Sequence, residues 1–254
     1  MLYFWVPVNA GILYMPRLIQ ELKKNQRDFH PIVSFDPVAD KITALDLTKN
    51  NTDLTEEIYS DTRKFAAYID KVRKESGSRF LIGGYNELRE MYKRSLLFDF
   101  EKIYELDVNE KPVEARRLHL GIDIWGPAGT VVSAPLGGMV HSFAFNNAFG
   151  DYGATIILQH QLGTMNFYTL YGHLSLGDIK TIRSGQFITR GQPFAHFGNP
   201  DENGNWPPHL HFQIIRDLRN YEGDYPGVCK FSEKEKYLDN CPDADLILQM
   251  NGFI

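Results

Sequence analysis

A short stretch with two histidines, residues 209–215, constrains this chain more than any other part of its sequence. The stretch alternates in polarity and is rich in Ile and Phe, which predicts a β-strand. Because successive side chains of a strand point to opposite faces, His209 and His211 share one face, while Leu210 and Phe212 point to the other. Two imidazoles on one face can bind a single divalent metal ion, although such pairs also occur on ordinary half-exposed sheets.

A second element, residues 116–125, supplies another histidine and a carboxylate. His119 and Asp123 are four positions apart, a spacing that suits one face of a helix or of an extended segment. The glycine at position 121, its β-branched neighbours and the Gly-Pro pair that follows favour the extended form. Gly121 then lies on the same face and leaves room between the two polar side chains. With one imidazole of the strand described above, they would make an open three-ligand zinc site.

A third element, Tyr171-Gly172-His173-Leu174-Ser175, places another histidine at the end of a predicted strand rich in Tyr and Phe. The three elements follow one another in the order and with the spacing of the lysostaphin-type zinc endopeptidases. The segment from about Leu118 to Ile215 resembles that family, and the turns that link its motifs resemble it as well.

The resemblance implies a role for each of the five polar residues. It assigns Zn²⁺ to His119, Asp123 and His211, and it places His173 and His209 close to the metal without binding it. One histidine of that second pair would take a proton from water and the other would stabilise the oxyanion. The sequence does not say which does which.

The function that the resemblance implies is that of a zinc metalloendopeptidase. Such an enzyme would hydrolyse peptide bonds in peptidoglycan-type or related short peptides through a zinc-activated water, with a peptide or peptidoglycan fragment as its partner. One alternative is a non-lytic, metal-bound module that binds peptide or regulates a partner. Another is a phosphocarrier domain that uses paired histidines, but Asp123 counts against it, because a phosphoryl carrier needs no carboxylate ligand.

Two further residues near the motifs are open to more than one interpretation. The family usually approaches its His-x-His pair through a turn of small residues, whereas here bulky Trp206 lies in that approach. It could narrow the groove or form a platform for substrate. His160 is a candidate to support the metal ligands from behind, or else an ordinary core residue.

The fold class we expect is α+β, with a mainly antiparallel β-sheet peptidase domain behind an α-rich N-terminal region. We predict three parts: residues 1–110, α-rich; 111–216, the β-rich domain; and 217–254, an extension packed on that domain. Helical spacing predicts one helix that begins near Glu56 and ends at Ser76-Gly77, and another from about Asn86 to Leu97. The α-rich region could also cover the groove and restrain the enzyme. The boundary falls in a polar stretch around residues 106–114.

Composition excludes some partners and leaves other properties open. The net charge of −5 gives no reason to expect nucleic acid or an anionic membrane as a partner. The oligomeric state remains open. Two cysteines, Cys229 and Cys241, do not make a disulfide framework in a chain of 254 residues, and we expect free thiols. The apolar segment from Met1 to Met15 lacks the charges and cleavage site of a signal peptide, so we expect it to belong to the fold and the protein to be cytoplasmic. Export would need a start further upstream.

Overall fold

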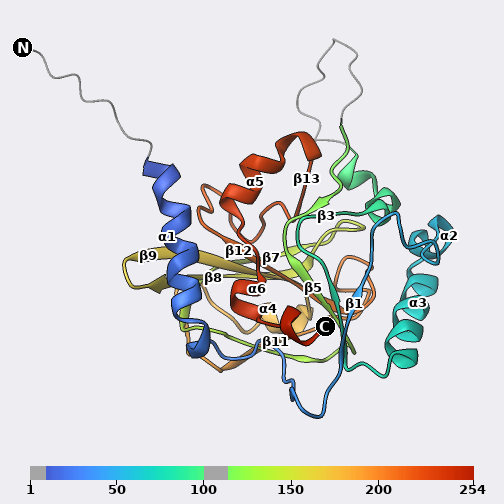
Figure 1. Cartoon of the computed structure of the whole chain (residues 1–254), viewed down its shortest axis with the longest axis horizontal. Coiled ribbons are helices and arrows are strands. Elements are labelled where there is room, and N and C mark those ends of the chain that lie inside the picture. Colours follow the sequence, from blue (N-terminus) through green and yellow to red (C-terminus); the bar gives the residue numbers. More distant parts are fainter. Residues whose placement is uncertain (1–9, 100–113) are drawn as a thin grey trace, which may run out of the picture.

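The computed structural model describes residues 10–99 and 114–254, and its centre is a large, mainly antiparallel sheet (Figure 1). The strands of this sheet stand in the order β1 (Ile42–Leu45), β2 (Phe80–Gly83), β5 (Ile122–Trp125), β12 (His209–Ile215), β9 (Met165–Leu174), β8 (Gly153–Leu162), β7 (Gly138–Asn146), β10 (Phe187–Ile188). Among these neighbours only β1 and β2 pair in parallel. The expected α+β class with a mainly antiparallel sheet is confirmed.

Two small sheets and several short helices complete the described part. The small sheets join β11 (Pro193–His196) to β6 (Val131–Ser133), and β13 (Val228–Cys229) to β4 (Leu118–His119) and β3 (Glu87–Leu88). The α-helices are α1 (Ala10–Lys24), α2 (Glu56–Ser60), α3 (Thr62–Glu75), α4 (Leu176–Ile179), α5 (Lys234–Asn240) and α6 (Asp245–Leu248). The 3-10 helices are η1 (Gln26–Asp28), η2 (Glu90–Arg94), η3 (Leu96–Phe98), η4 (Phe231–Glu233) and η5 (Asn251–Phe253). None of the described helices is long and apolar enough to cross a membrane.

The N-terminal region extends the central sheet. Parallel strands need a crossover connection. Helices α2 and α3 provide it between β1 and β2, and Figure 1 shows α3 beside β1. Strand β2 then pairs with β5, so Leu81 lies opposite Trp125. Phe65 of α3 packs on the same indole, with 5.8 Å between ring centroids. Residues on the two sides of position 110 therefore share one sheet and one core cluster; the predicted boundary stretch, up to residue 113, lies outside the described residues.

The predicted helix from Asn86 to Leu97 is wrong. Asn86 has a left-handed backbone with φ of 56°, β3 pairs with β4, and only the 3-10 helices η2 and η3 follow. The apolar spacing resembled one helical face, but Arg89 is fully buried here while Leu88 is exposed. The helix predicted from about Glu56 to Ser76 is present as two helices, α2 and α3. Asp61 separates them and caps α3, since its carboxylate accepts from two backbone N–H groups of that helix.

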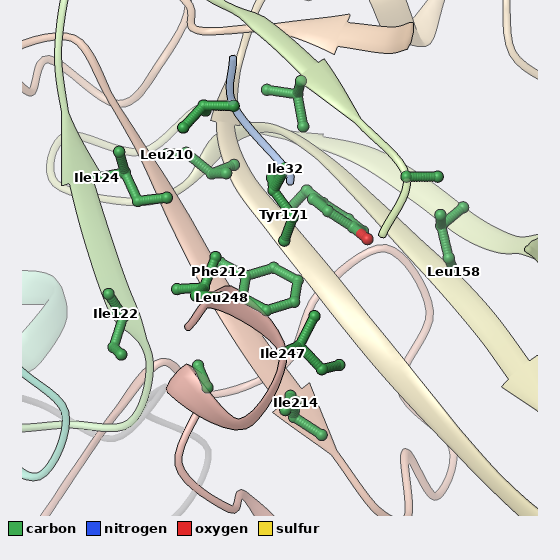
Figure 2. Packing of buried hydrophobic residues seen from close by; sticks show 14 of the residues in the cluster. Ile32, Ile122, Ile124, Leu158, Tyr171, Leu210, Phe212, Ile214, Ile247 and Leu248 are labelled. Carbon is green, nitrogen blue, oxygen red and sulfur yellow. The ribbon is translucent and has the colours of Figure 1, made fainter. Parts of the chain in front are cut away.

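The core lies under the strand that carries the His-x-His pair. Figure 2 shows Phe212 and Ile214 of β12 packed against Ile247 and Leu248 of α6. Leu210 belongs to the same buried cluster. The two histidines of β12 therefore face the opposite side, as the alternating pattern predicts.

The structure bears on the expectations for both ends of the chain. Of the first fifteen residues, 1–9 lie outside the described part and α1 begins at Ala10. Near the C-terminus, Cys229 and Cys241 are both free and buried. Burial raises the pKa of each thiol to about 12.

Candidate metal centre and active site

Two of the predicted ligands lie opposite each other on neighbouring strands. His211 of β12 pairs with Asp123 of β5 in the antiparallel ladder. Both side chains are buried, and His211 Nδ1 lies 3.1 Å from Asp123 Oδ1. The central sheet thus sets the spacing of these two groups through its backbone.

The third predicted ligand, His119, comes from β4, just before the chain crosses into β5. Its Nε2 lies 2.9 Å from His211 Nδ1 and 3.3 Å from Asp123 Oδ1. Gly121 lies between the two strands, and a Cβ at this position would be 2.6 Å from His211 Cε1. The absent side chain therefore makes room for the imidazole ring of His211.

Hydrogen bonds on the far sides of the two rings define which nitrogens carry protons. His119 Nδ1 donates to Gly84 O at 2.8 Å, which leaves its Nε2 without a proton in the neutral ring. His211 Nε2 donates to Gln213 Oε1 at 2.9 Å, and the amide is oriented because Gln213 Nε2 donates to Pro226 O. The His211 Nδ1 lone pair therefore also points inward.

Three acceptor atoms thus converge in a buried space with no proton among them. Their separations of 2.9, 3.1 and 3.3 Å compare with about 3.3 Å between donors of a tetrahedral zinc ion whose bonds are about 2.0–2.1 Å. The fixed outer hydrogen bonds are those that orient metal-binding histidines. The donor set fits a divalent cation, and in the part of the chain that the structure describes no other group of three such side chains gathers.

Burial shapes the protonation of these groups. It lowers the pKa of His119 to about 4, and the adjacent Arg89 guanidinium acts in the same direction. For Asp123, burial alone would raise the pKa, but His119, Arg89 and two hydrogen bonds outweigh it and hold the carboxyl pKa well below its usual range. His119 and Asp123 are therefore ready to bind a cation at neutral pH.

The other two predicted residues face the same space with one nitrogen each. His209 Nδ1 donates to Pro207 O and His173 Nδ1 donates to Asn203 O, both at 2.8 Å. The rings stack, with 4.1 Å between centroids, and His209 Nε2 lies 4.0 Å from Asp123 Oδ1. Burial lowers the pKa of His209 to about 4 and that of His173 well below its usual value.

An irregularity in the sheet aims His173 at the site. The pairing of β8 with β9 shifts register between Ala154 and Ile156, so β9 carries an extra residue there. His173 sits in this bulge with a φ of 62°, a left-handed conformation that is uncommon outside glycine. Its own N–H donates to Tyr152 O.

All of these groups except His119 line a cavity of about 730 Å³. Residues of η2 and η3 line this cavity, and so do residues of the C-terminal extension, including Tyr221, Asp224 and Tyr225. No feature of the sequence indicated that the extension contributes to a site. Trp206 also lines the cavity, but it is only 2% exposed and packs on the Arg94 guanidinium, 4.5 Å from the ring centroid. It is a fixed part of the wall.

His160 does not support the site. It hydrogen-bonds Thr169 Oγ1 and Gly137 O and lies outside the cavity lining. The residues that hydrogen-bond the ligands from outside the metal site are Gly84, Arg89 and Gln213. Gln213 follows His211 on the same strand, whereas Gly84 and Arg89 belong to no local motif.

Comparisons with known proteins agree with the motifs. Residues 117–222 match the model of Peptidase family M23. The chain is 32% identical over 127 residues to the L-Ala--D-Glu endopeptidase of Bacillus subtilis (strain 168), an alignment that covers 48% of this chain and 37% of that protein. The chain thus matches little more than a third of that relative's length. The resemblance to the lysostaphin-type peptidases is confirmed for this segment.

Two solved structures are also similar. A zinc containing peptidase from Vibrio cholerae is 27% identical with a TM-score of 0.33, over 43% of this chain and 32% of that one. The catalytic domain of lysostaphin from Staphylococcus simulans is 21% identical with a TM-score of 0.33, over 53% of this chain and 85% of that one.

Proposed function

We propose that this chain, whose residues 117–222 match Peptidase family M23, is a zinc-dependent endopeptidase that hydrolyses peptide bonds in peptidoglycan-type or related short peptides. One observation carries the proposal. Three unprotonated donor atoms converge beside a cavity that Asp123 and His211 line, and two further neutral imidazoles line the same cavity.

Zinc held by His119, Asp123 and His211 would supply a Lewis acid for the hydrolysis of an amide. The remaining steps fall to the two stacked imidazoles. Because each donates its Nδ1 proton to a backbone carbonyl, the Nε2 of His173 and of His209 is an acceptor at neutral pH. One of them takes the proton of the attacking water at its Nε2 and then passes that same proton to the leaving amine. The other takes up a proton from solvent at its Nε2, donates it in a hydrogen bond to the oxyanion, and returns it to solvent after the C–N bond has broken.

The backbone holds both imidazoles in a fixed orientation. Trp125 stacks on His209 with 3.9 Å between centroids, and the bulge in β9 holds His173 on the other side of that ring. Groups positioned in this way need little reorganisation when charge develops on the substrate.

The cavity suits a short peptide rather than a large folded substrate. Its walls combine aromatic rings with a few polar groups, which is the composition of sites for small ligands. The relative from Bacillus subtilis is named an L-Ala--D-Glu endopeptidase, and we propose short wall-type peptides as the substrate class here.

Metal analysis combined with a digest of purified peptidoglycan and of soluble stem-type peptides tests the proposal. We expect about one zinc per chain and new amino termini in the digest, both lost after removal of the metal with a chelator. Bound zinc without new amino termini on either substrate would favour the non-lytic, peptide-binding function.

A further inference from the structure

We propose that Arg89 is the positioning residue of the metal centre, so that the N-terminal region holds Asp123 and His119 in the geometry that binds the cation. The proposal rests on the proposed function for the identity of the cation. Its own evidence is a chain of contacts behind the ligands that neither the motifs nor the family match includes, since Arg89 lies outside residues 117–222.

Arg89 is fully buried and uses both edges of its guanidinium. Nη1 donates to Asp123 Oδ2 at 2.5 Å, and Nε donates to Glu87 Oε2 at 2.6 Å. Nη2 donates to Gly84 O at 3.1 Å. A fully buried arginine is rare unless each of its donors is satisfied, and here it joins two carboxylates and one carbonyl.

The contact with Asp123 decides which of its oxygens faces the cation. Oδ2 is taken by Arg89, so Oδ1 is the atom turned toward His119 and His211. Without the guanidinium, the carboxylate could rotate and present either oxygen, or both. The planar guanidinium of Arg89 at Oδ2 therefore leaves Oδ1 as the one oxygen of Asp123 that is oriented to bind the cation.

The same guanidinium reaches the second ligand through the backbone. Gly84 O accepts from Arg89 Nη2 and also from His119 Nδ1, so one carbonyl oxygen links the arginine to the imidazole. Two of the three ligands thus share a support from the segment 84–89.

The charges of Glu87, Arg89 and Asp123 together favour the binding of a cation. Glu87 and Asp123 flank one guanidinium, so the group of three keeps one net negative charge. Arg89 therefore compensates the buried carboxylates in part and leaves an attraction for a divalent ion. If Arg89 faced Asp123 alone, that pair would be neutral.

The backbone is shaped to admit the arginine. A Cβ on Gly83 would lie 2.8 Å from Arg89 Nη2 and 3.2 Å from Trp125 Nε1. A side chain at this position would push the guanidinium off its carbonyl partner. The glycine at the end of β2 is thus a second, independent sign that this path is built for Arg89.

The test compares the full-length variants Arg89→Met and Arg89→Lys with the wild-type protein. We measure zinc affinity by competition with a chromogenic chelator, the visible absorption spectrum of the Co²⁺-loaded protein, and the melting temperature with and without metal. A purely structural role would lower both melting temperatures equally. A positioning role predicts a smaller rise on adding zinc, about 10–100-fold weaker zinc binding and an altered cobalt spectrum.

Arg89→Lys keeps the positive charge but loses the planar set of N–H donors of the guanidinium. We therefore expect this variant to recover part of the zinc affinity but not the cobalt spectrum of the wild type. The matched control is Arg79→Met, which breaks the surface ion pair with Asp40 and should leave all metal readouts unchanged. If Arg89→Met does not fold, Arg89→Lys carries the test.

Either arginine variant, folded and binding zinc within twofold of the wild type with an unchanged cobalt spectrum, would overturn the proposal. A different result would overturn the proposed function: the wild-type protein itself would bind no zinc, or would bind zinc and cleave no peptide.

Discussion

His211 and Asp123 face each other across neighbouring antiparallel strands, and His211 Nδ1 lies 3.1 Å from Asp123 Oδ1. The ladder of β12 and β5 sets this distance, and the third donor is delivered from β4 within 3.3 Å of both. Two lone pairs and a carboxylate held this close repel one another, and a shared cation relieves that repulsion.

The first prediction concerns the ligands. His211→Ala and Asp123→Ala should each remove most of the bound zinc, because two remaining donors make an inadequate site. Metal analysis of the purified variants checks this. His196→Ala is the control, since this histidine pairs with Asp178 away from the cavity and should keep its zinc. Unchanged zinc in both ligand variants would defeat the assignment.

A second prediction uses the space left by Gly121. In Gly121→Ala the added Cβ would meet His211 Cε1 at 2.6 Å and the backbone oxygen of Phe212 at 2.7 Å, so the ligand must move. We expect zinc affinity to fall at least tenfold, measured by chelator competition. Gly177→Ala, whose added Cβ would lie 3.7 Å from Ser175 Oγ, should bind zinc as the wild type does. Equal affinity in both variants would show that His211 is free to shift.

A third prediction separates the metal ligands from the two stacked imidazoles. His173→Ala and His209→Ala should keep their zinc and lose about 10²–10⁴-fold in peptide hydrolysis, the usual contribution of a general base or oxyanion donor. The measurement is zinc content beside turnover on a short peptide. Loss of zinc in the His209 variant would require the roles of His209 and His211 to be exchanged.

A fourth prediction concerns the metal-free protein. Burial lowers the pKa of His119 and His209 to about 4, against about 6.5 for an unfolded histidine. Between these values the unfolded chain binds more protons than the native one, so stability should fall as pH drops from about 6.5 toward 4. Thermal melts in the presence of a chelator measure this.

The variant His209→Asn is the matched comparison for that experiment. Its amide can still donate to Pro207 O, but it does not titrate, so its melting temperature should depend less steeply on pH than that of the wild type. Parallel curves would mean that His209 keeps an ordinary pKa.

The fifth prediction concerns the N-terminal region. If residues before Lys111 only covered the groove, deleting them would raise turnover on short peptides. Leu81 and Phe65 instead lie against Trp125. The indole of Trp125 in turn stacks on the ring of His209. We therefore expect the shortened protein to lose metal affinity and to melt at a lower temperature. Faster turnover with a stable fold would restore the idea of a restraining cover.

The sequence predicted the face of β12 that carries the histidines, because alternation along a strand is a local property. Gly121 was predictable for the same reason, since its neighbours mark extended chain. The support from Arg89 was not predictable. The spacing of Leu88, Met91 and Leu96 imitates a helical face, and nothing local reveals that the polar residue is buried while Leu88 and Leu96 are exposed.

Partners that act through backbone atoms were also invisible to motif analysis. Gly84 and Pro226 serve through their carbonyl oxygens, which every residue has. The extension after residue 216 contributes a cavity wall through contacts far apart in sequence, and no periodicity marks such contacts in advance.

The strand that carries His119 lies between two others, β3 from the first hundred residues and β13 from the last thirty. Next to it, Leu120 donates its N–H to Gly227 O. A shortened chain that stops at residue 216 should accordingly bind zinc poorly, which a metal titration would reveal. During synthesis the ribosome must therefore release nearly the whole polypeptide before the ligand set can close, so we expect a nascent chain to carry no working hydrolase.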